Sequence, residues 1–177
     1  SFEAIIPLKT AEEAARIMKS NEELTIIPDE NQILFQCGDQ EIISRLVDGK
    51  FPDYEPIIPK TTATEIIINR GELLNSLKLA GVFAGRINDV KIKVGDNNKF
   101  LEVYSADAAL GENRYLVPIK ITGPSLSIAF NLRYLLDGLR PYNTEEVIFG
   151  INGSDKPVLI KTAEDKSFFY ILMPVKS

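Results

Sequence analysis

The sequence contains one pattern of elements three times, and this repeat limits the fold more than any other feature. Each copy begins with an apolar strand, continues with a short amphipathic helix and ends with three strands separated by tight turns. The copies begin near Glu3, Glu65 and Leu126, about sixty residues apart, which is longer than the common helical repeats. The sequence therefore predicts βαβββ modules in an α+β fold with antiparallel sheets, rather than a solenoid.

The three predicted helices carry signals of their own. Thr10 with Glu13 three residues later predicts a capping box at the first helix. Asn131 is expected to cap the third helix, and Pro141 prevents its continuation. Apolar side chains at helical spacing are expected to face the core, and these are Ala11, Ala14, Ala15, Met18, Leu73, Leu74, Leu77, Leu132, Leu135, Leu136 and Leu139.

The strands are separated by residues that favour turns. The segments "GDNNK", "LGENR" and "INGSDK" place Asn, Asp or Gly where the backbone is expected to adopt a positive φ. Within the strands "KIKV" and "LEVYSA", polar and apolar side chains alternate. This alternation predicts a sheet with one face exposed to solvent.

Composition is that of an ordinary globular protein. The 177 residues are 45% hydrophobic and 25% charged, without a run of 18 apolar residues or a cationic leader. A single cysteine, Cys37, cannot form an internal disulfide and is expected to be buried in a strand. These features favour a reducing, cytoplasmic location.

The residues available for chemistry are few. The chain has no histidine and one cysteine, so the commonest general base, metal ligand and nucleophile pairings are lacking. No glycine-rich phosphate loop occurs, and we expect neither a cofactor nor a metal. Carboxylate catalysis remains an alternative, although the adjacent pairs read as helix starts or solvated turns; they are Glu12/Glu13, Glu22/Glu23 and Glu145/Glu146.

Three segments resemble one known family. "SRLVDGKFPDYEPIIP" (residues 44–59), "SIAFNLRYLLDGL" and the C-terminal "YILMPVKS" are similar to the bacterial replicative sliding clamp, the beta subunit of DNA polymerase III. The resemblance covers the whole chain in order. It implies the DNA clamp fold, with antiparallel sheets outside and helices inside. Residues 1–60 would be the second half of clamp domain two with the interdomain linker, and residues 61–177 the complete domain three.

The resemblance implies a processivity factor without catalysis. Two protomers of the full-length protein would close a homodimeric ring that slides on duplex DNA without reading sequence. The charge distribution allows this. The whole chain has a net charge of −5, but the predicted helices carry +3 and the rest of the chain carries −8, so the positive charge lies where the DNA would be. The candidate DNA-facing residues are Arg16, Lys19, Lys78, Arg133 and Arg140.

The family also binds partner peptides in a pocket between domains two and three. The partners implied are the polymerase catalytic subunit, the clamp loader and other proteins with a clamp-motif peptide. Residue by residue, the implied pocket consists of Pro52, Pro56, Ile57, Asn131, Tyr134, Asp155, Pro157, Ile171, Met173, Pro174, Val175 and Lys176. Pro56 stands where the family often has a basic residue and Asp155 where it is usually apolar. The resemblance also implies that the first half of domain two, which supplies the remaining wall, is absent, so we expect this chain to bind peptide weakly, if at all.

The same resemblance places Val82 and Phe83 on the surface that docks on the first domain of the other protomer. Since the first module has no mate in this chain, we expect the chain to begin inside a domain and to be a fragment. A stand-alone peptide-binding module without a role at DNA and, less favoured, a carboxylate-based hydrolase are the alternatives. Further βαβββ copies upstream of Ser1 would decide for the ring.

Overall fold

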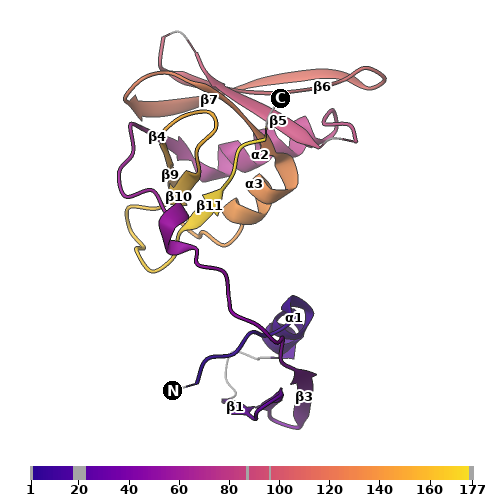
Figure 1. Ribbon diagram of the computed structural model, residues 1–177. Helices are drawn as coiled ribbons and strands as arrows, with labels where there is room; N and C mark the ends of the chain where they lie inside the picture. Colours follow the sequence, from indigo (N-terminus) through magenta and orange to yellow (C-terminus); the bar gives the residue numbers. More distant parts are fainter. Residues whose placement is uncertain (1, 18–22, 87, 96, 176–177) are drawn as a thin grey trace. The chain divides into compact units, whose positions relative to one another are not determined.

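The computed structural model describes residues 2–17, 23–86, 88–95 and 97–175. The chain divides into two compact units, Ser1–Asp53 and Tyr54–Ser177, and each is described by itself (Figure 1). None of the helices in the described part of the chain is long and apolar enough to cross a membrane.

The larger unit contains two of the predicted modules. The second module comprises β4 (Thr64–Asn69), α2 (Arg70–Gly81), β5 (Asp89–Val94), β6 (Phe100–Asp107) and β7 (Gly111–Thr122). The third comprises β8 (Ser127–Asn131), α3 (Leu132–Leu139), β9 (Glu146–Ile151), β10 (Val158–Lys161) and β11 (Tyr170–Leu172). The order of elements predicted for both modules is thereby confirmed.

These two modules exchange their first strands. All pairings are antiparallel, in the order β11-β10-β9-β4-β7-β6-β5-β8, so that β4 pairs with β9 and β8 pairs with β5. The first strand of each module therefore lies against the second strand of the other. On its other side β4 pairs with β7 of its own module. The corresponding contact of β8 is a hydrogen bond from the Val175 N–H to the Ala129 carbonyl (2.9 Å).

Equivalent caps begin the two helices. Asn69 and Asn131 have nearly the same backbone angles, φ −64°, ψ 120° and φ −65°, ψ 118°. Asn69 Oδ1 accepts the Glu72 N–H (3.0 Å), and Asn131 Oδ1 accepts the N–H groups of the first turn of α3. The predicted cap at Asn131 is confirmed, and its exact counterpart at Asn69 supports duplication of one module.

The core of the larger unit lies between the sheet and its two helices. Figure 1 shows α2 and α3 covering one side of the strands. The predicted helix positions Leu73, Leu77, Leu132, Leu135 and Leu139 are buried, while Leu74 and Leu136 are half-buried. Burial alternates along β5 and β6, which confirms the sheet with one solvent-facing side. Each fully buried leucine contributes about 1.5–3 kcal/mol relative to an exposed one.

The turn predictions are also confirmed. Asn98 in "GDNNK" has φ 56°, and Gly111 in "LGENR" has φ 98°. Both angles lie in the positive-φ region, which residues other than Gly and Asn rarely adopt. These residues therefore allow the short connections between β5 and β6 and between β6 and β7.

The smaller unit contains α1 (Leu8–Ile17), β1 (Leu24–Pro28), β2 (Gln32–Cys37) and β3 (Gln40–Arg45). The predicted capping box is wrong, because α1 already begins at Leu8. The Thr10 N–H donates to the Pro7 carbonyl (2.9 Å), and the Thr10 hydroxyl is 2.7 Å from Ser44 Oγ on β3. Proline is tolerated at a helix start because the first N–H groups have no intrahelical acceptor. Thr10 thus joins helix to sheet.

The buried face of α1 is narrower than predicted. Ala14 and Ile17 are buried, whereas Ala11 and Ala15 are exposed. Met18 lies outside the described residues. The core of this unit consists mainly of Ala14, Ile33 and Phe35, and Cys37 is buried in β2 as predicted.

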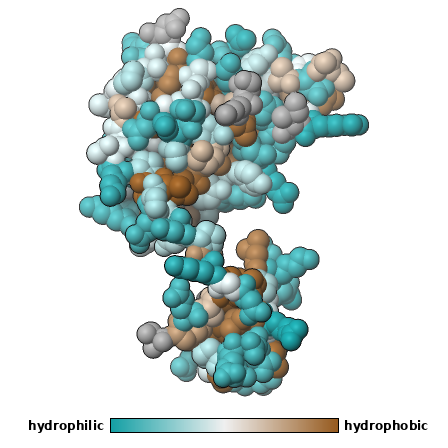
Figure 2. Space-filling view, in the orientation of Figure 1, coloured by the Kyte–Doolittle hydropathy of each residue, from teal (hydrophilic) through white to brown (hydrophobic). Residues whose placement is uncertain are grey.

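The first predicted strand of the smaller unit, "EAIIP", does not form a strand. In the larger unit a first strand pairs with the second strand of another module, and the described part of residues 1–53 offers only one module. The segment keeps one sheet-like contact, from the Val47 N–H to the Ile5 carbonyl (2.9 Å). Several large apolar side chains of this unit are exposed (Figure 2), and they are Phe2, Leu8, Ile26, Ile27, Ile43, Val47 and Phe51.

The proline-rich segment "GKFPDYEPIIP" crosses the boundary between the two units. Proline fixes φ and has no backbone N–H, so these prolines predict neither a helix nor a central strand. The structure contains a single 3-10 turn here, η1 (Glu55–Ile57). Pro56 occupies the start of that turn, where its missing N–H removes no hydrogen bond. Both Pro56 and Ile57 are exposed.

Candidate functional site

A cavity of about 590 Å³ opens in the larger unit beside the tail that follows β11. Its walls come from segments far apart in the sequence: β5, β8, the turn between β9 and β10, and the C-terminal tail. The lining residues are Lys91, Ser127, Ile128, Ala129, Ser154, Asp155, Met173, Pro174 and Val175.

The sheet register positions these walls. Leu172 pairs with Val158, and three residues later Val175 binds the backbone of Ala129, so the tail runs from β10 to the edge of β8. Pro174 between them has no N–H to donate, so the tail pairs with β8 less completely than β7 pairs with β4. Lys91 pairs directly opposite Ala129, which places both side chains on the same face.

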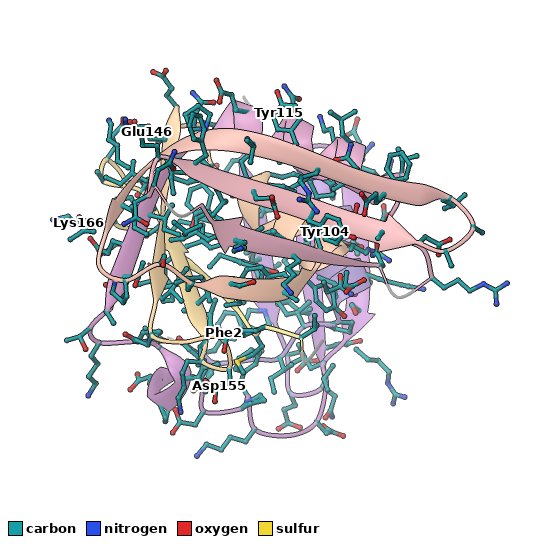
Figure 3. All side chains as sticks on the ribbon, turned by 90° about the horizontal axis from the view of Figure 1, so that it is seen from above. Phe2, Tyr104, Tyr115, Glu146, Asp155 and Lys166 are labelled. Carbon is teal, nitrogen blue, oxygen red and sulfur yellow. The ribbon has the colours of Figure 1, made fainter. Side chains whose placement is uncertain are left out.

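Four of the predicted pocket residues meet in this cavity: Asp155, Met173, Pro174 and Val175. Met173 is 52% exposed, so its flexible thioether is available to a ligand. Asp155 lies in the turn between β9 and β10 (Figure 3). Pro157 and Ile171 are half-buried and do not line the cavity, and Lys176 lies outside the described residues.

The other predicted pocket residues have different environments. Asn131 uses its side-chain oxygen to cap α3, so that oxygen already has two donors. Tyr134 on the first turn of α3 is 57% exposed. Pro56 and Ile57 are exposed in η1. Pro52 is exposed and belongs to the smaller unit.

Sequence reasoning missed the residues that β5 and β8 contribute. Lys91 and Ser127 lie in strands that read as ordinary alternating strands, and only the β5–β8 register and the path of the tail bring them to Met173. Ser127 carries a second signal, because its Oγ is buried without a hydrogen-bond partner among the described residues. A buried hydroxyl without a partner is unfavourable, which makes it a candidate for ligand contact.

The candidate DNA-facing residues fall into two groups. Arg16 and Arg140 form exposed ion pairs with Glu13 and Asp137, each 2.7 Å long. Lys78 and Arg133 are exposed, and the described part of the chain supplies neither with an ion pair. Lys19 lies outside the described residues.

Arg70, which contributes to the positive charge of the helices, has a structural contact instead. Its guanidinium donates to the carbonyls of Leu139 (3.0 Å) and Arg140 (3.3 Å) at the end of α3. A cation at the C-terminus of a helix is favourable because the last carbonyls carry partial negative charge. Less of the helix charge is therefore free than the sequence count indicates.

The predicted interface residues lie at the end of α2. Val82 is the C-cap residue and is 62% exposed, whereas Phe83 is half-buried near Gly111. Residues 111–118 of β7 pair only with β6 among the described strands, since β4 pairs with residues 119–122. An exposed apolar residue thus accompanies a strand with one unpaired edge.

The adjacent glutamates do not line the cavity at the tail. Glu13 and Glu146 are in exposed ion pairs with Arg16 and Lys120, while Glu12 and Glu145 are exposed; Glu22 lies outside the described residues. No group of three or more potential acidic, Cys or His metal ligands occurs among the residues that the structure describes.

Comparison with known proteins agrees with this architecture. Residues 55–176 match the DNA polymerase III beta subunit, C-terminal domain, and residues 1–53 match its central domain. The chain belongs to the DNA polymerase III beta subunit family. The recognised resemblance and the DNA clamp fold, both predicted from sequence, are thereby confirmed.

Members of this family resemble the chain over its whole length. The beta sliding clamp of Bacillus subtilis is 33% identical over 181 residues, which cover 100% of this chain and 48% of that protein. The beta sliding clamp of Synechococcus elongatus is 31% identical over 170 residues, which cover 96% of this chain and 45% of that protein. The chain thus spans about half the length of these relatives.

Solved structures give the same result. The crystal structure of the Bacillus subtilis DNA polymerase sliding clamp superposes with a TM-score of 0.90 at 30% identity, over 99% of this chain and 47% of that one. A Pseudomonas aeruginosa sliding clamp, solved bound to griselimycin, superposes with a TM-score of 0.88 at 27% identity, over 98% of this chain and 47% of that one.

Proposed function

We propose that this chain is the part of a bacterial sliding clamp that binds partner peptides, with residues 1–60 as the second half of domain two and residues 61–177 as domain three. The observation that carries the proposal is the cavity beside the tail, which brings Asp155 together with Met173, Pro174 and Val175. A concave site with apolar walls and a few polar groups is typical of short-peptide recognition.

The cavity suits an extended peptide with apolar anchors. Met173, Pro174 and Val175 supply an apolar wall, and the unbranched side chain of Met173 can adapt to different partners. We infer that the polymerase catalytic subunit and the clamp loader bind here through such peptides, and that the chain itself catalyses no reaction.

A titration tests the peptide site. The probe is a synthetic peptide with a Gln, a Leu and an aliphatic–aromatic pair, added to the isotopically labelled 177-residue chain and followed by NMR, which detects weak binding. We expect shifts at the tail, and Met173→Ala should weaken binding roughly tenfold because an apolar contact is lost. Leu116→Ala is the matched control, since Leu116 is equally exposed but lies outside the cavity. Full affinity in Met173→Ala would contradict the proposal.

We further propose that the helices face duplex DNA in the assembled ring. Lys78 and Arg133 support this, being exposed cations on α2 and α3 without ion pairs in the described chain. Lys78→Glu with Arg133→Glu should weaken binding to duplex DNA at low salt and flatten its salt dependence. Lys99→Glu, on the turn between β5 and β6, is the control, and an equal loss in this variant would contradict a specific role for the helices.

We also propose that Val82, Phe83 and the open edge of β7 form the surface that closes the ring. In the full-length protein, Val82→Glu should convert dimers to monomers in analytical ultracentrifugation, because it places a charge in an apolar interface. Phe169→Glu, at an exposed position between β10 and β11, should leave the dimer intact. A dimer that survives Val82→Glu would contradict this assignment.

A further inference from the structure

We propose that the cavity beside the tail contains a carboxylate subsite, in which the Lys91 ammonium and the Ser127 hydroxyl bind an acidic group of the partner peptide. The inference rests on the proposed peptide site and adds to it a preference in ligand charge. Its geometry comes from β5 and β8, whereas the apolar wall comes from the tail.

Lys91 is placed to reach a ligand in this cavity. Its cross-strand neighbour is Ala129, whose short side chain leaves space beside the lysine. Lys91 and Ala129 also line a second, smaller cavity of about 120 Å³, so that both hollows adjoin this pair of residues. Lys91 is exposed and has no ion pair within the described part of the chain, so its charge is available.

Ser127 supplies an independent observation. It lies two residues before Ala129 on β8, and alternate residues of a strand share a face. Its Oγ is buried and has no hydrogen-bond partner among the described residues. A carboxylate oxygen would accept a hydrogen bond from this hydroxyl while its charge neutralises that of Lys91, and thus satisfies both groups at once.

Asp155, on another wall, makes the two sides of the cavity differ in charge. Its carboxylate repels a second acid and attracts a cation, so an acidic group is favoured at the Lys91 side and disfavoured near the turn between β9 and β10. Asp155 was, with Pro56, one of the two residues expected to weaken the pocket. In this arrangement it selects among peptides instead of only reducing affinity.

The carboxylate has two possible sources in a peptide, an Asp or Glu side chain or the terminal carboxylate. Both present the same chemistry to Lys91, and the test separates them. The NMR titration is repeated with the probe peptide carrying a single Glu or a single Gln at successive positions, each as the free acid and as the C-terminal amide.

We expect one Glu peptide, or the free acid, to bind roughly twofold to fivefold more tightly than its neutral counterpart at low salt. This gain should disappear in Lys91→Met and at high ionic strength, and it should decrease in Ser127→Ala. Lys99→Met is the matched control, because Lys99 is exposed on the turn between β5 and β6 and does not line the cavity. Asp155→Asn should increase the affinity of the acidic peptide.

The outcomes separate the subsite from the peptide site. If Met173→Ala weakens every peptide but Lys91→Met and Lys99→Met do not differ, the carboxylate subsite is wrong and the peptide site stands. If neither Met173→Ala nor Lys91→Met changes the affinity of any peptide, or if no peptide binds, both are overturned. Melting curves of each variant show whether it is folded.

Discussion

The two units of this chain are built from the same module and differ in what the module has to pair with. In residues 54–177, two modules exchange first strands, and the helices and sheet enclose one continuous core. In residues 1–53, one module keeps its helix and three strands, but its first segment forms no strand and large apolar side chains remain exposed.

The difference shows that the first strand of this module depends on a neighbour. "EAIIP" and "TEIIIN" are both apolar and β-branched, yet only the second becomes a strand, β4, because β9 and β7 pair with its two edges. β1, which corresponds to β5 and β9, has one unpaired edge among the described strands and exposes Ile26 and Ile27. A second module would cover this edge.

The largest difference between the two units should appear in their unfolding when each is made as a separate polypeptide. A polypeptide of residues 54–177 should unfold in one cooperative transition, because it contains the complete core. Residues 1–53 alone should show no cooperative transition, since three strands and one helix of this size bury too little apolar surface. Urea unfolding followed by circular dichroism measures both. A cooperative transition of the smaller polypeptide would contradict the dependence on a second module.

Substitutions that create a cavity in the core of each unit should sharpen the comparison. Leu135 is fully buried on α3, so Leu135→Ala should destabilise the larger unit by about 3 kcal/mol through lost packing and the space left behind. Ile33→Ala removes a side chain equally buried in the smaller unit. It should leave the main urea transition of the full chain in place, and a shift as large as that of Leu135→Ala would show that the units unfold together.

The duplicated caps should have equal effects. Asn69→Ala and Asn131→Ala should each lower the free energy of unfolding by about 1 kcal/mol, because each removes the acceptor of first-turn N–H groups. Asn75→Ala, in the exposed middle of α2, is the control and should be neutral or slightly stabilising. If Asn131→Ala changes peptide affinity without changing stability, the residue serves the ligand rather than the helix.

Alkaline pH should destabilise the larger unit through a buried tyrosine that the smaller unit lacks. Burial raises the pKa of Tyr142 to about 12, and its hydroxyl donates to the Ile160 carbonyl (2.6 Å). Since the folded-state pKa lies above the unfolded value of about 10, the contribution of the protonated Tyr142 to folding stability is fully present below pH 10. It is lost as the pH rises towards 12. Residues 1–53 contain no tyrosine. Tyr142→Phe should cost about 1 kcal/mol at neutral pH and flatten the alkaline decline, and an unchanged pH profile would contradict this.

Local signals in the sequence were sufficient where the chain contacts itself nearby. The strand alternation, the turn residues Asn98 and Gly111 and the cap at Asn131 were predicted because each depends on a few adjacent residues. The capping box at Thr10 failed because α1 begins earlier and the hydroxyl approaches Ser44, thirty-four residues away. No local pattern distinguishes these two uses of a threonine.

The candidate site divides in the same way. Asp155, Met173, Pro174 and Val175, which line the cavity, were expected at a pocket from the family resemblance, whereas Lys91 and Ser127 carry no sequence signal of their own. Their place in the cavity follows from the pairing of β5 with β8 and from the bond between Val175 and Ala129.

The sequence by itself determined the module, its three copies and the family, because side-chain periodicity and turn chemistry are local properties. Only the tertiary structure decided which first strands form, that β4 and β8 exchange partners, and that a lysine of β5 lies beside the tail. The physical reason is that backbone hydrogen bonds between strands join residues distant in sequence, so an edge that lacks a neighbour cannot be recognised from its own residues.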